Sequence, residues 1–150
     1  MAQKHIFLEM ADFIDFELYG IVSSFSDAVQ FVFHFNQFFE TKFHRMADLD
    51  VLNEGEMAYY PMFEWENPNS QTHYHLIKNS SYSLTKKGKE SDLSLLFDIA
   101  PVLVQELKAY NYLLKVNGEE SSDWLKENNF IQKITKFDVD KIKSIDRLIF

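Results

Sequence analysis

The stretch that decides the fold is DIAPVLVQELKAYNYLLKV, which occupies residues Asp98–Val116. Asp98 is a favourable N-cap, and Pro101 falls in the first turn of a helix, where its missing N–H is not needed. Apolar residues follow at helical spacing: Ile99, Leu103, Leu107 and Tyr110, with Val102 beside them. From Tyr110 onward every second residue is apolar, and Leu113 is apolar on the other side. The pattern predicts a capped helix that leads into a strand buried on both faces, as in the centre of a sheet.

The same reasoning divides the rest of the chain into alternating strands and amphipathic helices. The expected elements are a strand at 13–23, a helix at 27–42, a short strand and turn at 43–52, a hairpin of 56–66 with 71–79, a linker at 79–92, a turn at 117–118, a helix from Ser121 or Ser122 to Phe137, and closing strands at 137–142 and 146–150. Gly20, inside the first strand, indicates a bulge or a close backbone approach. We therefore expect a single α+β domain over residues 1–150, with a mixed, mostly antiparallel sheet and about three helices packed on it.

Composition and charge narrow the class of protein. The 150 residues contain no cysteine, and their net charge is −8. Residues 1–75 hold 12 acidic against 3 basic residues and 16 of the 24 aromatic residues. An acidic surface repels phosphate backbones, so we expect no nucleic-acid partner. The sequence shows neither a signal-peptide pattern nor an apolar run long enough to cross a bilayer, and we expect a cytoplasmic protein without a membrane partner.

The hairpin carries the best candidate for a metal site. Asn67 and Pro68 favour a turn, and we expect Glu64 to lie opposite His73 in the paired strand. Residues two apart on a strand point to one face, so His73, His75 and Glu64 could together meet a zinc ion. The alternative is that these histidines are surface residues that pair with Glu64 and Glu66.

Motifs of the common enzyme classes are missing from the sequence. It contains no glycine-rich phosphate loop, no HExxH and no GxSxG, and only four glycines in all. Glu106, on the mostly apolar predicted helix, is a candidate general acid. The alternative is a carboxylate at the helix edge that is bonded to a neighbouring backbone amide or side chain. The sequence predicts no cofactor.

The segment VQELKAYNY, residues 104–112, resembles the motif of the bacterial IPExxxVDY family. Glu106 and Tyr112 match the motif identically and Val104 matches it conservatively, whereas Gln105, Tyr110 and Asn111 depart from it. FELYGIVSS at 16–24, YHLIKN at 74–79 and IKSIDRLIF at 142–150 extend the similarity along the chain. The resemblance implies a small cytoplasmic bacterial protein and no particular activity.

Two interpretations of Glu106 and Tyr112 follow from this motif. In the structural one, Glu106 anchors the chain by accepting a bond from a backbone N–H or from the Tyr112 hydroxyl. In the functional one, both side chains face a binding groove.

Two functional hypotheses remain. The first is a non-enzymatic protein-interaction module that binds another protein through its acidic, aromatic-rich half, with a homo-oligomer left open. Phe33, which falls off the apolar stripe of the 27–42 helix, indicates such a partner or a wide groove. The second is a small metal-binding protein or metal-dependent enzyme that uses His73, His75 and Glu64.

Overall fold

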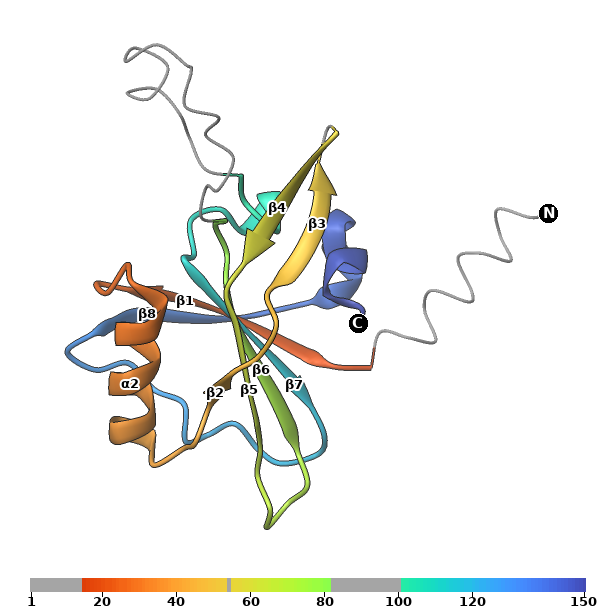
Figure 1. The fold of residues 1–150 in the computed structure, drawn as a ribbon. Coiled ribbons are helices and arrows are strands. Elements are labelled where there is room, and N and C mark those ends of the chain that lie inside the picture. Colours follow the sequence, from red (N-terminus) through yellow and green to blue (C-terminus); the bar gives the residue numbers. More distant parts are fainter. Residues whose placement is uncertain (1–14, 54, 82–100) are drawn as a thin grey trace.

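The computed structural model describes residues 15–53, 55–81 and 101–150 (Figure 1). The strands are β1 (Glu17–Ser23), β2 (His44–Arg45), β3 (Leu49–Asn53), β4 (Glu56–Tyr60), β5 (Met62–Glu66), β6 (His73–Lys78), β7 (Tyr112–Asn117) and β8 (Ile131–Phe137). The helices are the α-helix α2 (Ala28–Phe39) and the 3₁₀ helices η1 (Gln105–Leu107), η2 (Val139–Lys141) and η3 (Lys143–Leu148). The strand predicted at 13–23 is thus confirmed within the described residues, and so is the second arm of the hairpin, as β6. The first arm, predicted as one strand over 56–66, is instead two strands, because Pro61 separates β4 from β5 and only β5 pairs with β6.

Six of these strands form one sheet in the order β2-β5-β6-β7-β1-β8, and β3 pairs with β4 in a separate ribbon. Every strand pair among the described residues is antiparallel, so the expectation of a mixed sheet is wrong. The strand β7 lies between β6 and β1, and all its residues except Asn117 are buried. The prediction of a central strand buried on both faces is confirmed.

The two faces of the sheet carry separate hydrophobic cores. On one face α2 packs over the sheet, and Phe31 and Phe35 lie beside Tyr74, Leu114 and other buried side chains. On the other face lie the 3₁₀ helices, the segment 101–110 and the β3–β4 ribbon. The sheet is therefore the middle layer, and each side chain of β5, β6 or β7 belongs to one face or the other.

The helix α2 forms where the sequence predicts it. The Asp27 carboxylate accepts a hydrogen bond from the Val29 amide at 3.3 Å, and Glu40 ends the helix in the left-handed conformation with φ 56°. The apolar stripe faces the sheet, and Ala28, Phe31, Val32 and Phe35 are buried. Among the described residues, no helix is long and apolar enough to cross a membrane.

The expectation of about three packed helices is wrong, because α2 is the one helix of seven or more residues that the described ranges contain. Of the helix predicted from Asp98, residues 98–100 lie outside the described residues, and the rest is irregular chain with the short η1. Asn79 explains this outcome. Its side chain accepts a hydrogen bond from the Val104 amide and donates to the carbonyl oxygens of Leu107 and Tyr110, all at 3.0 Å. These bonds hold the chain in a loop that still buries its apolar residues.

The helix predicted from Ser121 to Phe137 is also wrong, because residues 131–137 form β8, which pairs with β1. The apolar residues Ile131 and Ile134 lie three apart, as in a helix, but both face the core under α2. A bulge produces this spacing: Ser23 pairs with Ile131 and Val22 with Lys133, so Gln132 is the extra residue.

Three smaller expectations meet different outcomes. The closing strands predicted at 137–142 and 146–150 are instead the 3₁₀ helices η2 and η3. Residues 82–92 of the predicted linker lie outside the described residues. At Gly20 the close approach comes from side chains, because an added Cβ would lie 2.6 Å from Phe137 and 2.8 Å from Tyr110.

We expect Leu114→Ala and Leu107→Ala each to lower the free energy of unfolding by about 2–5 kcal/mol, because each removes buried methyl groups from a packed core. Both side chains are buried, one on each face of the sheet. Denaturant unfolding of the variants measures the change. The control is Leu52→Ala, where the leucine is 67% exposed and the change should stay within about 0.5 kcal/mol. A neutral Leu114→Ala would contradict the central position of β7.

Candidate functional site

The candidate site lies on the hairpin of β5 and β6, on the face away from α2. The loop between these strands runs from Asn67 to Thr72, whose backbone N–H and C=O groups bond at 3.0 Å. Because this loop is longer than expected, Glu64 pairs with His75 and Glu66 with His73, two residues away from the predicted register. A shift of two keeps every side chain on its predicted face.

The structure brings the three predicted metal ligands together. One ligand atom from each of Glu64, His73 and His75 lies within 4.8 Å of the other two. Glu64 Oε1 is 3.1 Å from His73 Nε2 and 3.9 Å from His75 Nε2. The two imidazole rings stack, with centroids 4.6 Å apart and planes at 9°. Both rings therefore present their Nε2 atoms to one carboxylate.

A third histidine reaches the same carboxylate from β2. His44 pairs with Glu64 across the strands, and its Nε2 lies 3.5 Å from Glu64 Oε2. Its side chain is 65% exposed, so it can rotate toward or away from the site. Sequence spacing gives no sign of this neighbour, because only the pairing of β2 with β5 brings His44 to the hairpin.

The electrostatics of the site favour neutral imidazole at His75. Burial, helped by the positive charges of His73 and Lys115, lowers the pKa of His75 to about 4. The hydrogen bond from His73 lowers the pKa of the Glu64 carboxyl below its usual value, against a partial burial that would raise it. A neutral imidazole and an ionised carboxylate are the protonation states that bind metal ions.

Lys115 borders the site from β7, where it pairs with His75. Its ammonium donates to the Leu148 carbonyl at 2.7 Å and lies over the Phe150 ring at 3.8 Å from the centroid. Burial lowers the pKa of Lys115 to about 8. Its remaining positive charge opposes a bound cation, and no sequence pattern marks it in advance.

The second ring nitrogen of His75 limits the affinity of the site for a metal ion. His75 Nδ1 is buried and has no hydrogen-bond partner within the described part of the chain. If Nε2 binds a metal ion, the proton must sit on Nδ1, where it has no acceptor. Metal-binding histidines usually donate that proton to a carboxylate or carbonyl, so we expect moderate rather than tight binding.

Two imidazoles and one carboxylate nevertheless match a known coordination chemistry. Zinc accepts two His and one Glu as its three protein ligands and keeps a fourth position for water or substrate. Ligand atoms around tetrahedral zinc lie roughly 3.3 Å apart, so small rotations of the side chains suffice to close the cluster. The arrangement can hold a divalent transition metal ion.

The three motif residues do not form a common site. Tyr112 lies under α2, and its hydroxyl donates to the Phe25 carbonyl at 2.8 Å. Val104 is buried on the other face. Glu106 is exposed and accepts a hydrogen bond from the Ser144 amide at 3.2 Å, which matches the structural interpretation of this carboxylate.

The pKa of Glu106 agrees with an anchoring role. Partial burial would raise the pKa of the carboxyl, but hydrogen bonds from its own backbone amide and from Ser144 outweigh that effect and lower it. Glu106 therefore ties the segment around η1 to the start of η3.

Comparison with known proteins finds no matching family model, no matching curated protein and no matching solved structure. The resemblance of residues 104–112 to the IPExxxVDY motif therefore stays a prediction.

We expect acid to destabilise the metal-free protein through His75. Its pKa is 6.5 in the unfolded chain and about 4 in the fold, so between these values only the unfolded chain binds the proton. The free energy of unfolding is then unaffected above pH 6.5 and falls by up to about 3 kcal/mol as the pH drops to 4. Urea unfolding across this range measures the loss.

The variant His75→Gln should remove this part of the acid sensitivity. The control is His34→Gln on α2, because His34 stacks on Phe25 at 4.6 Å and lies away from the hairpin. In this control variant, the free energy of unfolding should depend on pH as it does in the wild type. Equal slopes for the wild type and His75→Gln would show that His75 is not held neutral.

Proposed function

We propose that this protein binds one divalent transition metal ion, such as zinc, through Glu64, His73 and His75. The observation that supports the proposal most is the convergence of two imidazole nitrogens on one carboxylate, with all three ligand atoms within 4.8 Å. The hairpin supplies all three ligands, and β6 is held between β5 and β7. The ligands therefore sit on regular strands rather than on a loop, which favours a preformed site.

The ligand types select the class of ion. Imidazole suits zinc, copper, nickel and iron, whereas magnesium and calcium prefer sites made only of oxygen. An ion held by three side chains keeps open positions, and His44 lies close enough to fill one of them. We assign metal binding to this site and no reaction.

A protein-interaction module remains the second candidate, and exposed apolar side chains on α2 support it. Val29 is 57% exposed, Phe33 56% and Phe38 46%. Large aromatic side chains are enriched in protein interfaces. These residues belong to the acidic, aromatic-rich half of the chain that the sequence indicates for a partner. We further propose that the protein acts in the cytoplasm, as expected from its sequence.

The metal proposal is tested with untagged protein that has been stripped by a chelator and titrated with Co²⁺ and then Zn²⁺. We expect one ion per chain, with a dissociation constant in roughly the micromolar range, since the unpaired Nδ1–H of His75 costs about 1–3 kcal/mol. Zinc at about a hundred times its dissociation constant should raise the free energy of unfolding by about 2.7 kcal/mol. The visible absorption of Co²⁺ reports the coordination.

Variants separate this site from adventitious binding. His73→Ala and Glu64→Gln should each weaken Co²⁺ binding by about tenfold or more, because each removes one of three ligands. His34→Gln, which removes a histidine outside the site, should bind as the wild type does. Sub-stoichiometric binding, or an unchanged affinity in His73→Ala, would contradict the metal site.

The second candidate predicts that a native lysate yields one stoichiometric partner on the immobilised protein, identified by mass spectrometry. Phe33→Ser should lose this partner, because it removes exposed aromatic surface from α2. Leu52→Ser, which changes an exposed residue on the β3–β4 ribbon, should retain it. Repeated absence of any stoichiometric partner would count against the interaction module.

A further inference from the structure

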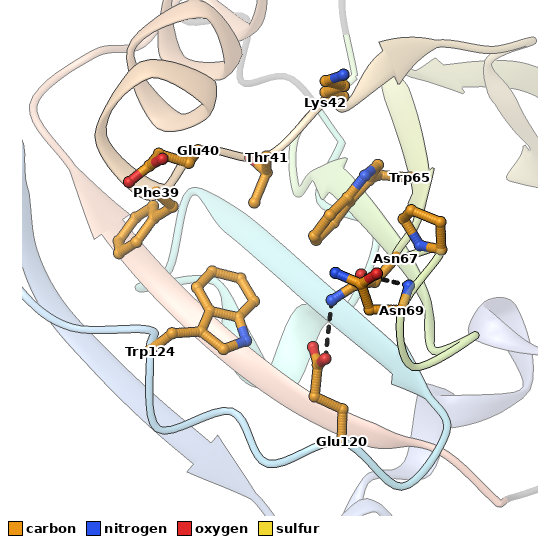
Figure 2. Close-up of a pocket in the computed structure, with 10 residues that line it drawn as sticks. Phe39, Glu40, Thr41, Lys42, Trp65, Asn67, Asn69, Glu120 and Trp124 are labelled. Atoms are coloured by element: carbon orange, nitrogen blue, oxygen red, sulfur yellow. Dashed lines mark hydrogen bonds between the residues drawn. The ribbon is translucent and has the colours of Figure 1, made fainter.

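A pocket of about 380 Å³ opens on the face of the sheet that carries α2 (Figure 2). It lies between the end of α2, the β5–β6 hairpin loop and the loop that follows β7. Its size falls in the range of small-molecule and side-chain binding pockets. The metal site is on the opposite face, because Glu64 and Trp65 are successive residues of β5 and point to opposite faces.

Three aromatic rings form the walls of the pocket. Phe39 and Trp124 stand on one side and Trp65 on the other. The planes of Phe39 and Trp124 meet at 71°, with centroids 5.3 Å apart. Trp65 stacks on Tyr74 at 17°, whereas Tyr74 meets Trp124 at 76°. The two tryptophans are therefore steeply inclined to each other and enclose a space from different directions.

Carboxylates add negative charge to this space. Glu120 lines the pocket from the loop that follows β7, and Glu40 lines it from the end of α2 (Figure 2). Glu120 Oε1 accepts a hydrogen bond from the Asn67 side chain at 2.8 Å, and Oε2 accepts one from the Tyr74 hydroxyl. These bonds fix the carboxylate in place. Lys42 is the one basic residue of the lining.

The backbone around the pocket is also fixed. The Asn36 side chain accepts hydrogen bonds from the Thr41 hydroxyl at 2.8 Å and from the Phe43 amide at 2.9 Å, so the chain after α2 is tied back to the helix. On the other side the Glu120 amide donates to the Thr72 hydroxyl at 3.3 Å. The aromatic walls are thus positioned before a ligand arrives, which lowers the cost of binding.

We propose that this pocket binds a cationic alkylammonium group. Aromatic faces attract cations through the ring quadrupole, and several inclined rings around one space are the usual receptor for methylated ammonium groups. The fixed Glu120 carboxylate supplies the complementary charge. Among the cation–π contacts of the described residues, none involves Trp65 or Trp124, so no described lysine or arginine occupies a face of either tryptophan.

The ring geometry favours a cation over a sugar. A sugar ring presents a broad face of C–H groups and is best received by one aromatic platform, whereas the inclined faces of Trp65 and Trp124 surround a compact group. The same ammonium chemistry occurs in a free small molecule and in a methylated lysine of a protein. Both sources place a trimethylammonium group against the rings.

The protein reports on this pocket through its own fluorescence, because both of its tryptophans line it. Choline titrated into the full chain should change the tryptophan emission saturably. The matched neutral probe is 3,3-dimethylbutan-1-ol, which replaces the ammonium nitrogen by carbon at nearly the same shape. We expect it to bind about tenfold more weakly or worse, because it lacks the charge that the rings and Glu120 attract.

Two variants and a control locate the binding. Glu120→Gln should weaken choline about threefold or more while leaving the alcohol unchanged, because it removes charge and keeps the shape. Trp124→Leu should weaken both probes, with Trp65 as the remaining reporter. Phe33→Leu changes an exposed aromatic residue outside the pocket and should have no effect.

Further titrations identify the source of the ligand, and some of their outcomes would overturn the proposal. A trimethyllysine peptide that binds at least about tenfold more tightly than choline indicates a protein partner, and equal affinities indicate a small molecule. Equal binding of choline and the alcohol would show a merely apolar pocket. If choline causes no change in the tryptophan emission, the ammonium assignment is overturned, whether or not glucose binds. None of these results depends on the metal site.

Discussion

The burial of β7 on both faces is the constraint on which the rest of the structure depends. A strand in this position needs an apolar layer above and below it, and the two layers are attached to it directly. On one face Tyr112 stacks on Phe31 of α2 at 3.9 Å and donates to the Phe25 carbonyl. On the other face Lys115 donates to the Leu148 carbonyl of η3. Through this strand the helix and the C-terminal segment are positioned relative to each other.

Strand periodicity made part of the candidate site predictable from the sequence. Glu64, His73 and His75 were expected on one face, and they lie on one face although the pairing differs by two residues. Side chains of a strand alternate between the two faces of the sheet, so a shift of two residues in the pairing leaves each side chain on the same face. The predicted face of these residues is therefore right although the loop is longer than expected. The approach of His44 and Lys115 depends on which strands pair, and sequence spacing carries no information on that.

The helices were less predictable, because two other features of the structure bury apolar residues that stand at helical spacing in the sequence. Around Leu103 and Leu107 the Asn79 side chain replaces the hydrogen bonds that a helix would make for itself, so apolar residues are buried on an irregular chain. In β8 the bulge at Gln132 places Ile131 and Ile134 on one face, three residues apart. In both cases the partner is more than 20 residues away in the sequence, which is beyond the reach of a periodicity argument.

The strand β5 serves both faces of the sheet with successive side chains. Glu64 belongs to the histidine cluster and Trp65 to the aromatic pocket. If a single residue were inserted or deleted within β5, every later side chain of the strand would change sides, and a charged group would replace an aromatic one in the core under α2. Insertions and deletions within β5 are therefore tolerated only if they add or remove an even number of residues. Changes in the length of this hairpin should accordingly fall at the exposed residues 69–71 of its loop, where the count of residues does not decide which face a side chain meets.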